Sequence, residues 1–281
     1  MLATFFALPF HLLRWAWVAY RSRYRGQEQW EVFRVLASLG VKTQFARRSD
    51  GRCRQRLFGF VVEGSSYELL LLLFKEMFLF EPYAFEPGTT APLIIDGGAN
   101  IGMAVLYFKK HFPEARILAF EPSPEAFHLL ARNVAANHLR NVELHNVALA
   151  TTTSDLPFYT EADGATINGS LRPYAASVRT VRVPARRLVD YLPPAGNIDL
   201  LKLDVEGTEF ALLADLDQLG ALGRFRQLIV EYHYPIGTAE SDQLATCLHT
   251  FTKRGFAYCF KMVFPRTEHG QDVILHCWQP G

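Results

Sequence analysis

The stretch that decides the fold runs from residue 93 to residue 102 and reads Leu93-Ile94-Ile95-Asp96-Gly97-Gly98-Ala99-Asn100-Ile101-Gly102. Its first three residues are apolar and typical of a buried strand, and the glycines that follow predict a tight turn into a helix. In open α/β sheets, ligands bind beyond the carboxyl ends of the strands, where glycines let the backbone approach a bound molecule closely. The stretch therefore predicts a Rossmann-like α/β domain that binds a nucleotide-type cofactor.

The segments around this stretch alternate between apolar runs of strand length and helical stretches. We expect strands at residues 93–95, 117–120, 142–146, 198–203 and 227–232, helices at 101–111, 124–137, 209–219 and 241–254, and closing strands at 257–262 and 273–278. Such alternation is typical of βαβ units and a parallel sheet. The last two strands, separated by a loop with Pro265 and Gly270, can pair antiparallel. The sequence thus predicts a seven-stranded sheet with a C-terminal antiparallel hairpin.

Two further features complete the predicted organisation. Extra strands are expected at residues 156–159 and 178–183, around a polar loop at 161–170. Ser65 and Glu68 have the spacing of a capping box, which predicts a helix through the apolar run 69–80. The Pro, Gly and Thr residues of 86–92 indicate a linker into the sheet. We therefore divide the chain into a helical N-terminal extension, residues 1–64, and a catalytic domain, residues 65–281.

The N-terminal extension is basic and partly apolar. Residues 1–60 hold eleven Arg and Lys against three Asp and Glu, although the whole chain has a net charge of only +1. The aromatic side chains that accompany this charge (Phe5, Phe6, Trp15 and Trp17) favour anionic membrane headgroups over nucleic acid as a partner. We expect peripheral membrane contact through residues 1–25 and no nucleic acid partner; the alternative is a solvated basic surface.

Composition and cysteine spacing bound the class of protein. Hydrophobic residues make up 49% of the 281 residues and charged residues 20%, which is ordinary globular usage. Residues 1–13 are apolar but too short and interrupted to span a membrane, so an interfacial or packed amphipathic helix is expected there. The four cysteines form no C-x-x-C pair, so neither a zinc site nor a disulfide framework is indicated. The expected location is the cytoplasm, at the inner face of the membrane where the extension binds.

Charge at the end of the first strand distinguishes between two kinds of cofactor. Gly97, Ala99 and Gly102 match a loose G-x-A-x-x-G pattern, so a dinucleotide is an option. Asp96, however, would place a carboxylate against a pyrophosphate, whereas S-adenosylmethionine has no phosphate and presents an ammonium and a sulfonium. The positions Asp96, Gly98, Asn100 and Gly102 therefore favour S-adenosylmethionine.

The next two strand ends offer further cofactor contacts. Glu121 follows the strand 117–120, at about the length of one βα unit past Asp96, and an acid there can accept hydrogen bonds from both ribose hydroxyls. Asn146 and Ala148 follow the third strand, where adenine would lie. Alone, Glu121 could be a surface acid and the third position a plain strand-to-loop junction.

These residues resemble the FkbM family of S-adenosylmethionine-dependent methyltransferases. The similarity extends from about residue 65 to residue 278, and its most specific part is Asp199-Leu200-Leu201-Lys202-Leu203-Asp204-Val205-Glu206-Gly207-Thr208-Glu209. The resemblance implies a class I methyltransferase fold and, for many relatives, O-methylation of a hydroxyl on a sugar, a glycan or a secondary metabolite. Residues 1 to about 60 fall outside it.

The ends of the fourth and fifth strands carry the residues predicted to act on the acceptor. Asp204 and Glu206 follow one strand, and His233 follows the other, where a transferable methyl group would lie. Methyl transfer to an alcohol needs alignment and a base for the hydroxyl proton, a role that His233 or either carboxylate could fill. The alternatives are a structural histidine and, for Glu206, an acid capping the next helix. Paired carboxylates also suit Mg²⁺, but nothing supplies a distinctive ligand set, so no metal is predicted.

Two other functions stay open at this point. One is an oxidoreductase or epimerase that uses a dinucleotide, which calorimetry with both cofactors would distinguish. The other is a catalytically silent module that docks at membranes through the extension. Acidic residues at both the cofactor and the acceptor side argue against a silent module.

Overall fold

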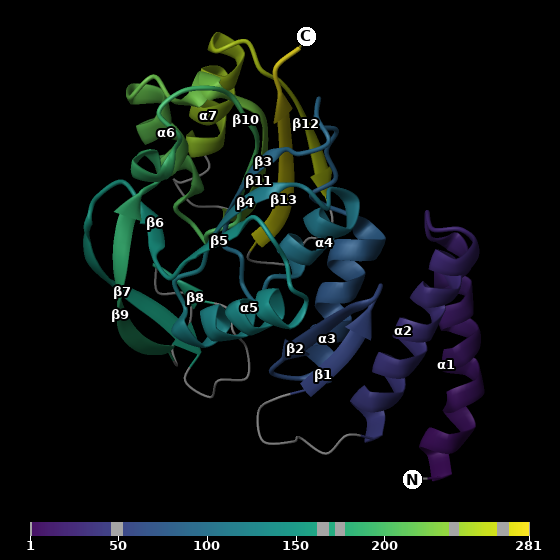
Figure 1. Ribbon diagram of the computed structural model, residues 1–281. Helices are drawn as coiled ribbons and strands as arrows, with labels where there is room; N and C mark the ends of the chain where they lie inside the picture. Colours follow the sequence, from purple (N-terminus) through teal and green to yellow (C-terminus); the bar gives the residue numbers. More distant parts are fainter. Residues whose placement is uncertain are drawn as a thin grey trace.

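The centre of the molecule is a seven-stranded sheet (Figure 1), in a computed structural model that describes residues 2–45, 53–161, 169–171, 178–235, 242–262 and 270–280. The strand order is β12-β13-β11-β10-β3-β4-β5. These strands are β3 (Leu93–Gly97), β4 (Arg116–Phe120), β5 (Val142–His145), β10 (Ile198–Leu203), β11 (Phe225–Pro235), β12 (Ala257–Met262) and β13 (Gly270–Trp278). The strands from β5 to β11 pair parallel, and β13 pairs antiparallel with both β11 and β12. The predicted sheet and its closing hairpin are confirmed.

Alternate residues of the central strands build two separate hydrophobic cores. Ile94 and Leu200 belong to one buried cluster, while their neighbours Ile95 and Leu201 belong to the other. Helices α4 (Met103–His111) and α5 (Pro124–Ala136) contribute to the first cluster, and α6 (Glu209–Gln218) and α7 (Asp242–Lys253) to the second. Because both faces are covered, the central strands consist mostly of apolar residues and do not alternate with polar ones, which makes them recognisable in the sequence.

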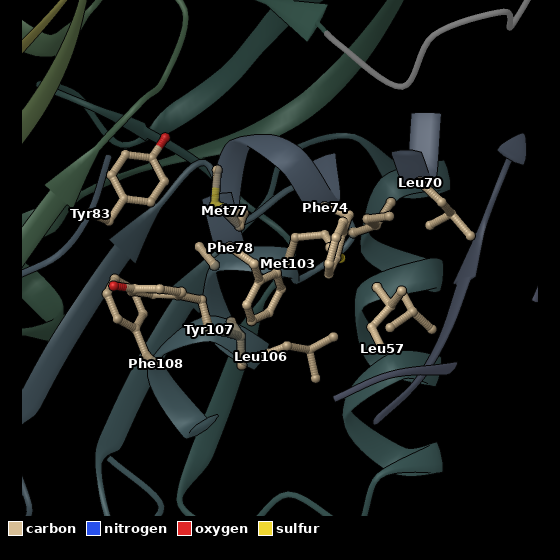
Figure 2. Packing of buried hydrophobic residues seen from close by; sticks show 14 of the residues in the cluster. Leu57, Leu70, Phe74, Met77, Phe78, Tyr83, Met103, Leu106, Tyr107 and Phe108 are labelled. Atoms are coloured by element: carbon tan, nitrogen blue, oxygen red, sulfur yellow. The ribbon is translucent and has the colours of Figure 1, made fainter. Parts of the chain in front are cut away.

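The N-terminal part packs onto the α4 side of the sheet. It comprises α1 (Leu2–Arg21), α2 (Gly26–Phe45), the hairpin of β1 (Cys53–Leu57) and β2 (Phe60–Gly64), the helix α3 (Tyr67–Lys75) and the π-helical segment η1 (Glu76–Phe80). Figure 1 shows α1 and α2 side by side at the edge of the molecule away from α6 and α7. Leu57 and Phe74 lie in the same cluster as Leu106 and Phe108 of α4 (Figure 2). The boundary at residue 64 remains a prediction, and side chains on both sides of it share one core.

The start of α3 differs from the predicted capping box. Ser66, rather than Ser65, is the N-cap, and its side chain accepts a hydrogen bond of 3.1 Å from the amide of Leu69. The helix widens into η1 at Glu76 and ends at Glu81, whose φ of +48° lies in the left-handed region. The carboxylate of Glu81 binds Arg23 and accepts from Tyr24, so it ties η1 to the turn between α1 and α2.

A second, four-stranded sheet flanks the site edge of the first. Its order is β6 (Ala148–Ala150), β9 (Val178–Arg187), β7 (Ser154–Glu161) and β8 (Gly169–Ser170), and the short helices η2 (Leu188–Tyr191) and η3 (Leu222–Arg224) complete the fold. The extra strands predicted at 156–159 and 178–183 lie within β7 and β9. Most of the predicted polar loop at 161–170 falls outside the described residues. Within the described ranges, no helix combines the length and apolar character needed to cross a membrane.

Candidate functional site

The site lies where the strand order reverses. From β3 the chain proceeds outward to β4 and β5, and it then returns to β10 on the other side of β3. Ligands of open α/β sheets bind at such a switch point, beyond the carboxyl ends of the strands. Gly98 lies here with a φ of +80°, and a Cβ on it would be 1.8 Å from the carbonyl oxygen of Asp204. The loops after β3 and β10 therefore touch at a position that only glycine can occupy.

Glu121, at the end of β4, organises the glycine turn. Its Oε2 accepts from the amide of Asn100 and its Oε1 from the amide of Ser123, each at 2.8 Å. The residue is 6% exposed. Burial raises the pKa of Glu121 to about 7, although both backbone donors oppose this shift. The ionised form of Glu121 is thus disfavoured by burial and still has lone pairs without a backbone donor. Hydrogen bonds from the hydroxyl groups of a ligand would stabilise this ionised form.

A first cavity, called cavity A, opens beside Glu121. Its lining residues are Gly98, Asn100, Glu121, Pro122, Ala148, Leu149, Phe158, Leu171, Asp204, Val205 and Glu206. Three of these side chains are carboxylates and six are apolar, and none of the described lining residues is basic. This lining therefore suits a ligand with positive charge, hydroxyl groups and a flat apolar part. It disfavours a ligand that carries phosphate, because the carboxylates would repel it.

Asp96 does not line cavity A, contrary to the role that its position suggested, and instead pairs with a buried lysine. Its carboxylate is fully buried, and Oδ1 lies 3.1 Å from the Nζ of Lys202. The same ammonium donates to the carbonyl oxygen of Gly98 at 2.6 Å. Asp96 therefore contributes to the site indirectly, because it holds the lysine that fixes the glycine turn.

Tyr83 and Glu231 join Lys202 and Asp204 in one buried polar cluster. The hydroxyl of Tyr83 lies 2.8 Å from Oε2 of Glu231 and 3.2 Å from Oδ2 of Asp204, and Lys202 Nζ lies 3.5 Å from the same Asp204 oxygen. Burial alone would lower the pKa of Lys202, but Asp96, Asp204 and Glu231 raise it above its ordinary value. Burial and the carboxylates also raise the pKa of Tyr83. Lys202 is therefore a permanent cation and Tyr83 a neutral donor.

The loop after β10 holds Glu206 in a strained backbone conformation. Its φ is +59°, and its carbonyl oxygen accepts from the hydroxyl of Ser170 at 2.6 Å. The buried carboxylate of Glu209 accepts from the amides of Val205 at 3.0 Å and Gly207 at 3.1 Å. Glu209 thus satisfies amides before α6, and the N-cap residue of this helix is Thr208. Left-handed backbone at a non-glycine residue is a feature of functional sites.

A second cavity, called cavity B, adjoins cavity A. Its polar side chains are Glu76, Tyr83, Asn100, Lys202, Asp204, Glu206 and Glu231. Gly98, Asn100, Asp204 and Glu206 line both cavities, so the two spaces meet at these residues. Asp204 and Glu206, which the sequence predicts to face the acceptor, therefore lie at the junction between two binding spaces.

The remaining predicted residues have varied positions. Ala148 lines cavity A, whereas the side chain of Asn146 donates to the carbonyl oxygens of Glu121 at 2.8 Å and Pro122 at 3.2 Å and so supports the loop. Gly102 has a φ of +91°, and a Cβ there would be 2.7 Å from Leu130 of α5, so it allows close helix packing. His233 lies in the backbone of β11, and its side chain is outside the described residues.

Sequence reasoning missed three residues of the site. Lys202 could have been found, because a charged residue inside the apolar run of β10 must be paired when buried. Glu231 lies two residues before His233 on the same strand and carries the same kind of signal. Tyr83 lies in an irregular segment after η1, more than a hundred residues from Asp204, and no local pattern points to it.

Comparisons with known proteins identify the family of the chain. The profile of the methyltransferase FkbM domain matches residues 96–258, which is more than half of the chain. A protein described as methyltransferase 1, from Beauveria bassiana, is 32% identical over 163 residues, which cover 51% of this chain and 66% of that protein. The 2-O-methyltransferase NoeI of Sinorhizobium fredii is 30% identical over 139 residues, covering 44% of this chain and 56% of the relative. The matched segments thus span less than two thirds of either relative.

Among solved structures, TYW2 of P. horikoshii in complex with MeSAdo has a TM-score of 0.49 at 12% identity, and the match covers 82% of this chain and 72% of that chain. The seven-stranded sheet with its antiparallel closing hairpin is the fold predicted from the sequence. The profile match begins at Asp96 and includes Glu121, Lys202, Asp204 and Glu231, so it contains the polar centre of both cavities except for Tyr83 and Glu76. The chain belongs to the FkbM methyltransferase family.

Proposed function

We propose that this protein uses S-adenosylmethionine to methylate a hydroxyl group, with the cofactor in cavity A and the acceptor in cavity B. The observation that carries the proposal is the lining of cavity A, which has three carboxylates and no basic side chain among the described residues. A dinucleotide would place its pyrophosphate against this negative charge, which disfavours the oxidoreductase or epimerase alternative. The ammonium and sulfonium of S-adenosylmethionine would instead be attracted to it.

The cavity A residues match the parts of this cofactor. Glu121 would accept hydrogen bonds from the ribose hydroxyls, and the apolar side chains of Ala148, Leu149 and Phe158 would contact adenine. Asp204 and Glu206 would balance the cationic end of the molecule, near Asn100. When bound, the cofactor supplies a methyl group activated by its attachment to a positively charged sulfur.

The acceptor-side residues would orient the hydroxyl and remove its proton. Asp204 is held by Lys202 and Tyr83, so its carboxylate has a fixed orientation at the junction of the two cavities. Glu206 lines the same junction, and His233 belongs to the neighbouring strand β11. We assign the role of general base to His233 or to one of these carboxylates, because each can accept the proton that the alcohol loses as its oxygen is methylated.

The acceptor class proposed here is a small molecule or glycan that carries a free hydroxyl. The relative from Sinorhizobium fredii is a 2-O-methyltransferase, which supports transfer to oxygen. The chemistry of cavity B supports it too, since carboxylates can remove a proton from an alcohol that is aligned for transfer.

We also propose that α1 contacts the inner face of the cytoplasmic membrane. Three large side chains at helical spacing point away from the core: Leu13 is 71% exposed, Trp17 is 60% exposed and Tyr20 is 67% exposed. The exposed Arg14 and Arg21 accompany them. Interfacial helices combine such an apolar stripe with cations that bind anionic headgroups. The membrane contact is an addition to the catalytic site and does not replace it.

Calorimetry tests the cofactor assignment. The purified chain should bind S-adenosylhomocysteine and S-adenosylmethionine but show no heat of binding with NAD⁺. Glu121→Gln should weaken S-adenosylhomocysteine binding by roughly tenfold or more, because charge-assisted hydrogen bonds contribute about 1.5–3 kcal/mol each. Glu125→Gln is the matched control, since this carboxylate is 61% exposed and lies only four residues along the chain. Binding of NAD⁺ without binding of S-adenosylhomocysteine would reject the proposal.

A further inference from the structure

Cavity B has one wall that is entirely apolar. This wall consists of Leu69, Leu72, Leu73, Met77, Met103 and Ala104, and the cavity has a volume of about 230 Å³. Its opposite side carries the buried polar cluster around Tyr83 and Lys202. Such a division matches an amphipathic ligand, whose polar end carries the reactive group and whose other part is apolar. The two sides of cavity B together therefore indicate the polarity of the acceptor.

Helix α3 forms half of this wall, and it packs into the core by one face and lines the cavity with another. Leu70 and Phe74 of α3 are fully buried in the core below (Figure 2). The cavity side of α3 is formed by residues 69, 72 and 73, which have the i, i+3, i+4 spacing of a single helix face, and Glu76 at the start of η1 ends this apolar stripe with a carboxylate. Leu72 is 53% exposed, although it lies among the lining residues. An apolar stripe at a cavity, rather than in the core, gains free energy when an apolar ligand covers it.

The segment after α3 is a π-helical turn that lines the same cavity. η1 is a π-helix of five residues that starts at Glu76, and both Glu76 and Met77 line cavity B. π-helical turns are rare and occur frequently at functional sites. Residues 67–80 also precede the segment 96–258 that the family profile matches. Four of the six wall residues therefore lie outside the shared methyltransferase core, where a determinant of substrate choice belongs, whereas Met103 and Ala104 of α4 lie within it.

The charges of cavity B limit the acceptor further. Glu76, Asp204, Glu206 and Glu231 contribute four carboxylates, and Lys202 is the one basic side chain among the described lining residues. Lys202 is already engaged by Asp96 and by the carbonyl oxygen of Gly98. An acceptor with a phosphate or carboxylate would be repelled, since like charges in a partly desolvated site interact unfavourably.

We infer that cavity B takes a neutral alcohol whose body is predominantly apolar, with its hydroxyl at the polar junction and its apolar part against α3 and η1. The inference rests on the proposed function and narrows it. It favours an apolar metabolite over a sugar or a phosphorylated compound, and it assigns Leu72 and Met77 to acceptor selection.

Methionine methyl groups provide a direct readout of this binding. The chain has four methionines, and two of them, Met77 and Met103, line cavity B. In protein labelled with ¹³C at the methionine methyl groups and saturated with S-adenosylhomocysteine, these two signals can be assigned with Met77→Leu and Met103→Leu. Menthol serves as the neutral apolar alcohol, and methyl β-glucoside and glucose 6-phosphate serve as the sugar and the phosphorylated compound.

Menthol should shift the Met77 and Met103 signals with at least tenfold higher affinity than either sugar compound. Leu72→Ser should weaken menthol binding about tenfold and leave S-adenosylhomocysteine affinity unchanged. Leu219→Ser is the matched control, since Leu219 is 47% exposed at the end of α6 and lines neither cavity.

Equal or tighter binding of a sugar compound, no shift with any compound, or unchanged menthol affinity in Leu72→Ser would overturn the inference. The proposed function fails differently, by loss of S-adenosylhomocysteine binding in calorimetry. Menthol shifts in a protein that does not bind this cofactor product would leave the apolar pocket standing and remove the methyltransferase assignment.

Discussion

The carboxylate of Glu121 links cofactor binding to pH in a way that can be measured. In the free protein, burial raises its pKa from 4.5 to about 7. Such a difference makes the charged form about 3 kcal/mol less favourable in the folded state than in the unfolded chain. Because the folded pKa is the higher one, the folded state binds more protons, and stability falls as pH rises from about 4.5 to about 7. We expect this group to cost roughly 2–3 kcal/mol of stability between pH 5 and pH 8.

A ligand that donates hydroxyl hydrogen bonds to Glu121 should reverse part of this cost. The charged carboxylate accepts such bonds best, so binding should lower the pKa of Glu121 and release its proton. If binding returns the pKa to its ordinary value, close to one proton leaves on binding at pH 6. The affinity for S-adenosylhomocysteine should then be about tenfold weaker at pH 6 than at pH 8.

Calorimetry in two buffers with different ionisation enthalpies measures the released proton directly. Glu121→Gln should abolish both the proton release and the pH dependence. The variant should also bind more weakly, because it loses the charge-assisted hydrogen bonds from the ligand hydroxyls. It should be less stable as well, because the single carbonyl oxygen of glutamine can accept from only one of the amides of Asn100 and Ser123, and an unsatisfied buried donor costs about 1–3 kcal/mol. Glu125→Gln should behave like the original protein. Equal heats in both buffers, or proton release that persists in Glu121→Gln, would refute the assignment of Glu121 to the ribose.

Three more predictions follow from the site and from α1. In thermal unfolding, Gly98→Ala should lower the free energy of unfolding by at least about 2 kcal/mol more than Gly59→Ala. Both glycines have a positive φ, but only at position 98 would the new Cβ lie 1.8 Å from another atom. Equal effects of the two substitutions would contradict the close approach of the loops. If His233 is the base, His233→Ala should reduce turnover by about 10² to 10⁴ without changing S-adenosylhomocysteine affinity, whereas near-normal turnover would move the role to a carboxylate. The full chain should co-sediment with anionic vesicles, and salt should weaken this binding. The double substitution Trp17→Ala with Tyr20→Ala should abolish vesicle binding, whereas the control Tyr258→Ala should not. Unchanged vesicle binding in the double variant would reject α1 as the membrane-binding surface.

Much of the fold could be predicted from the sequence because the central strands are buried on both faces. A strand such as Ile198–Leu203 then has apolar residues on both faces, at four of its six positions. The same logic placed Glu121 and Asp204 at strand ends on one edge of the sheet. The predicted start of α3 was one residue off, because Ser65 and Ser66 are adjacent candidates for the N-cap and only the backbone conformation selects between them.

The sequence by itself therefore determined the seven-stranded sheet, the switch point beyond β3 and β10, and the family, because these follow from local periodicity and from one contiguous signature. Only the tertiary structure decided that Asp96 acts through Lys202, that Tyr83 completes the polar cluster with Glu231, and that α3 and η1 wall the second cavity. Each of these contacts joins segments far apart along the chain. A strand pattern reports which side of the sheet a residue faces, but which distant side chain meets it there depends on how the helices and loops pack, and local sequence carries no record of that.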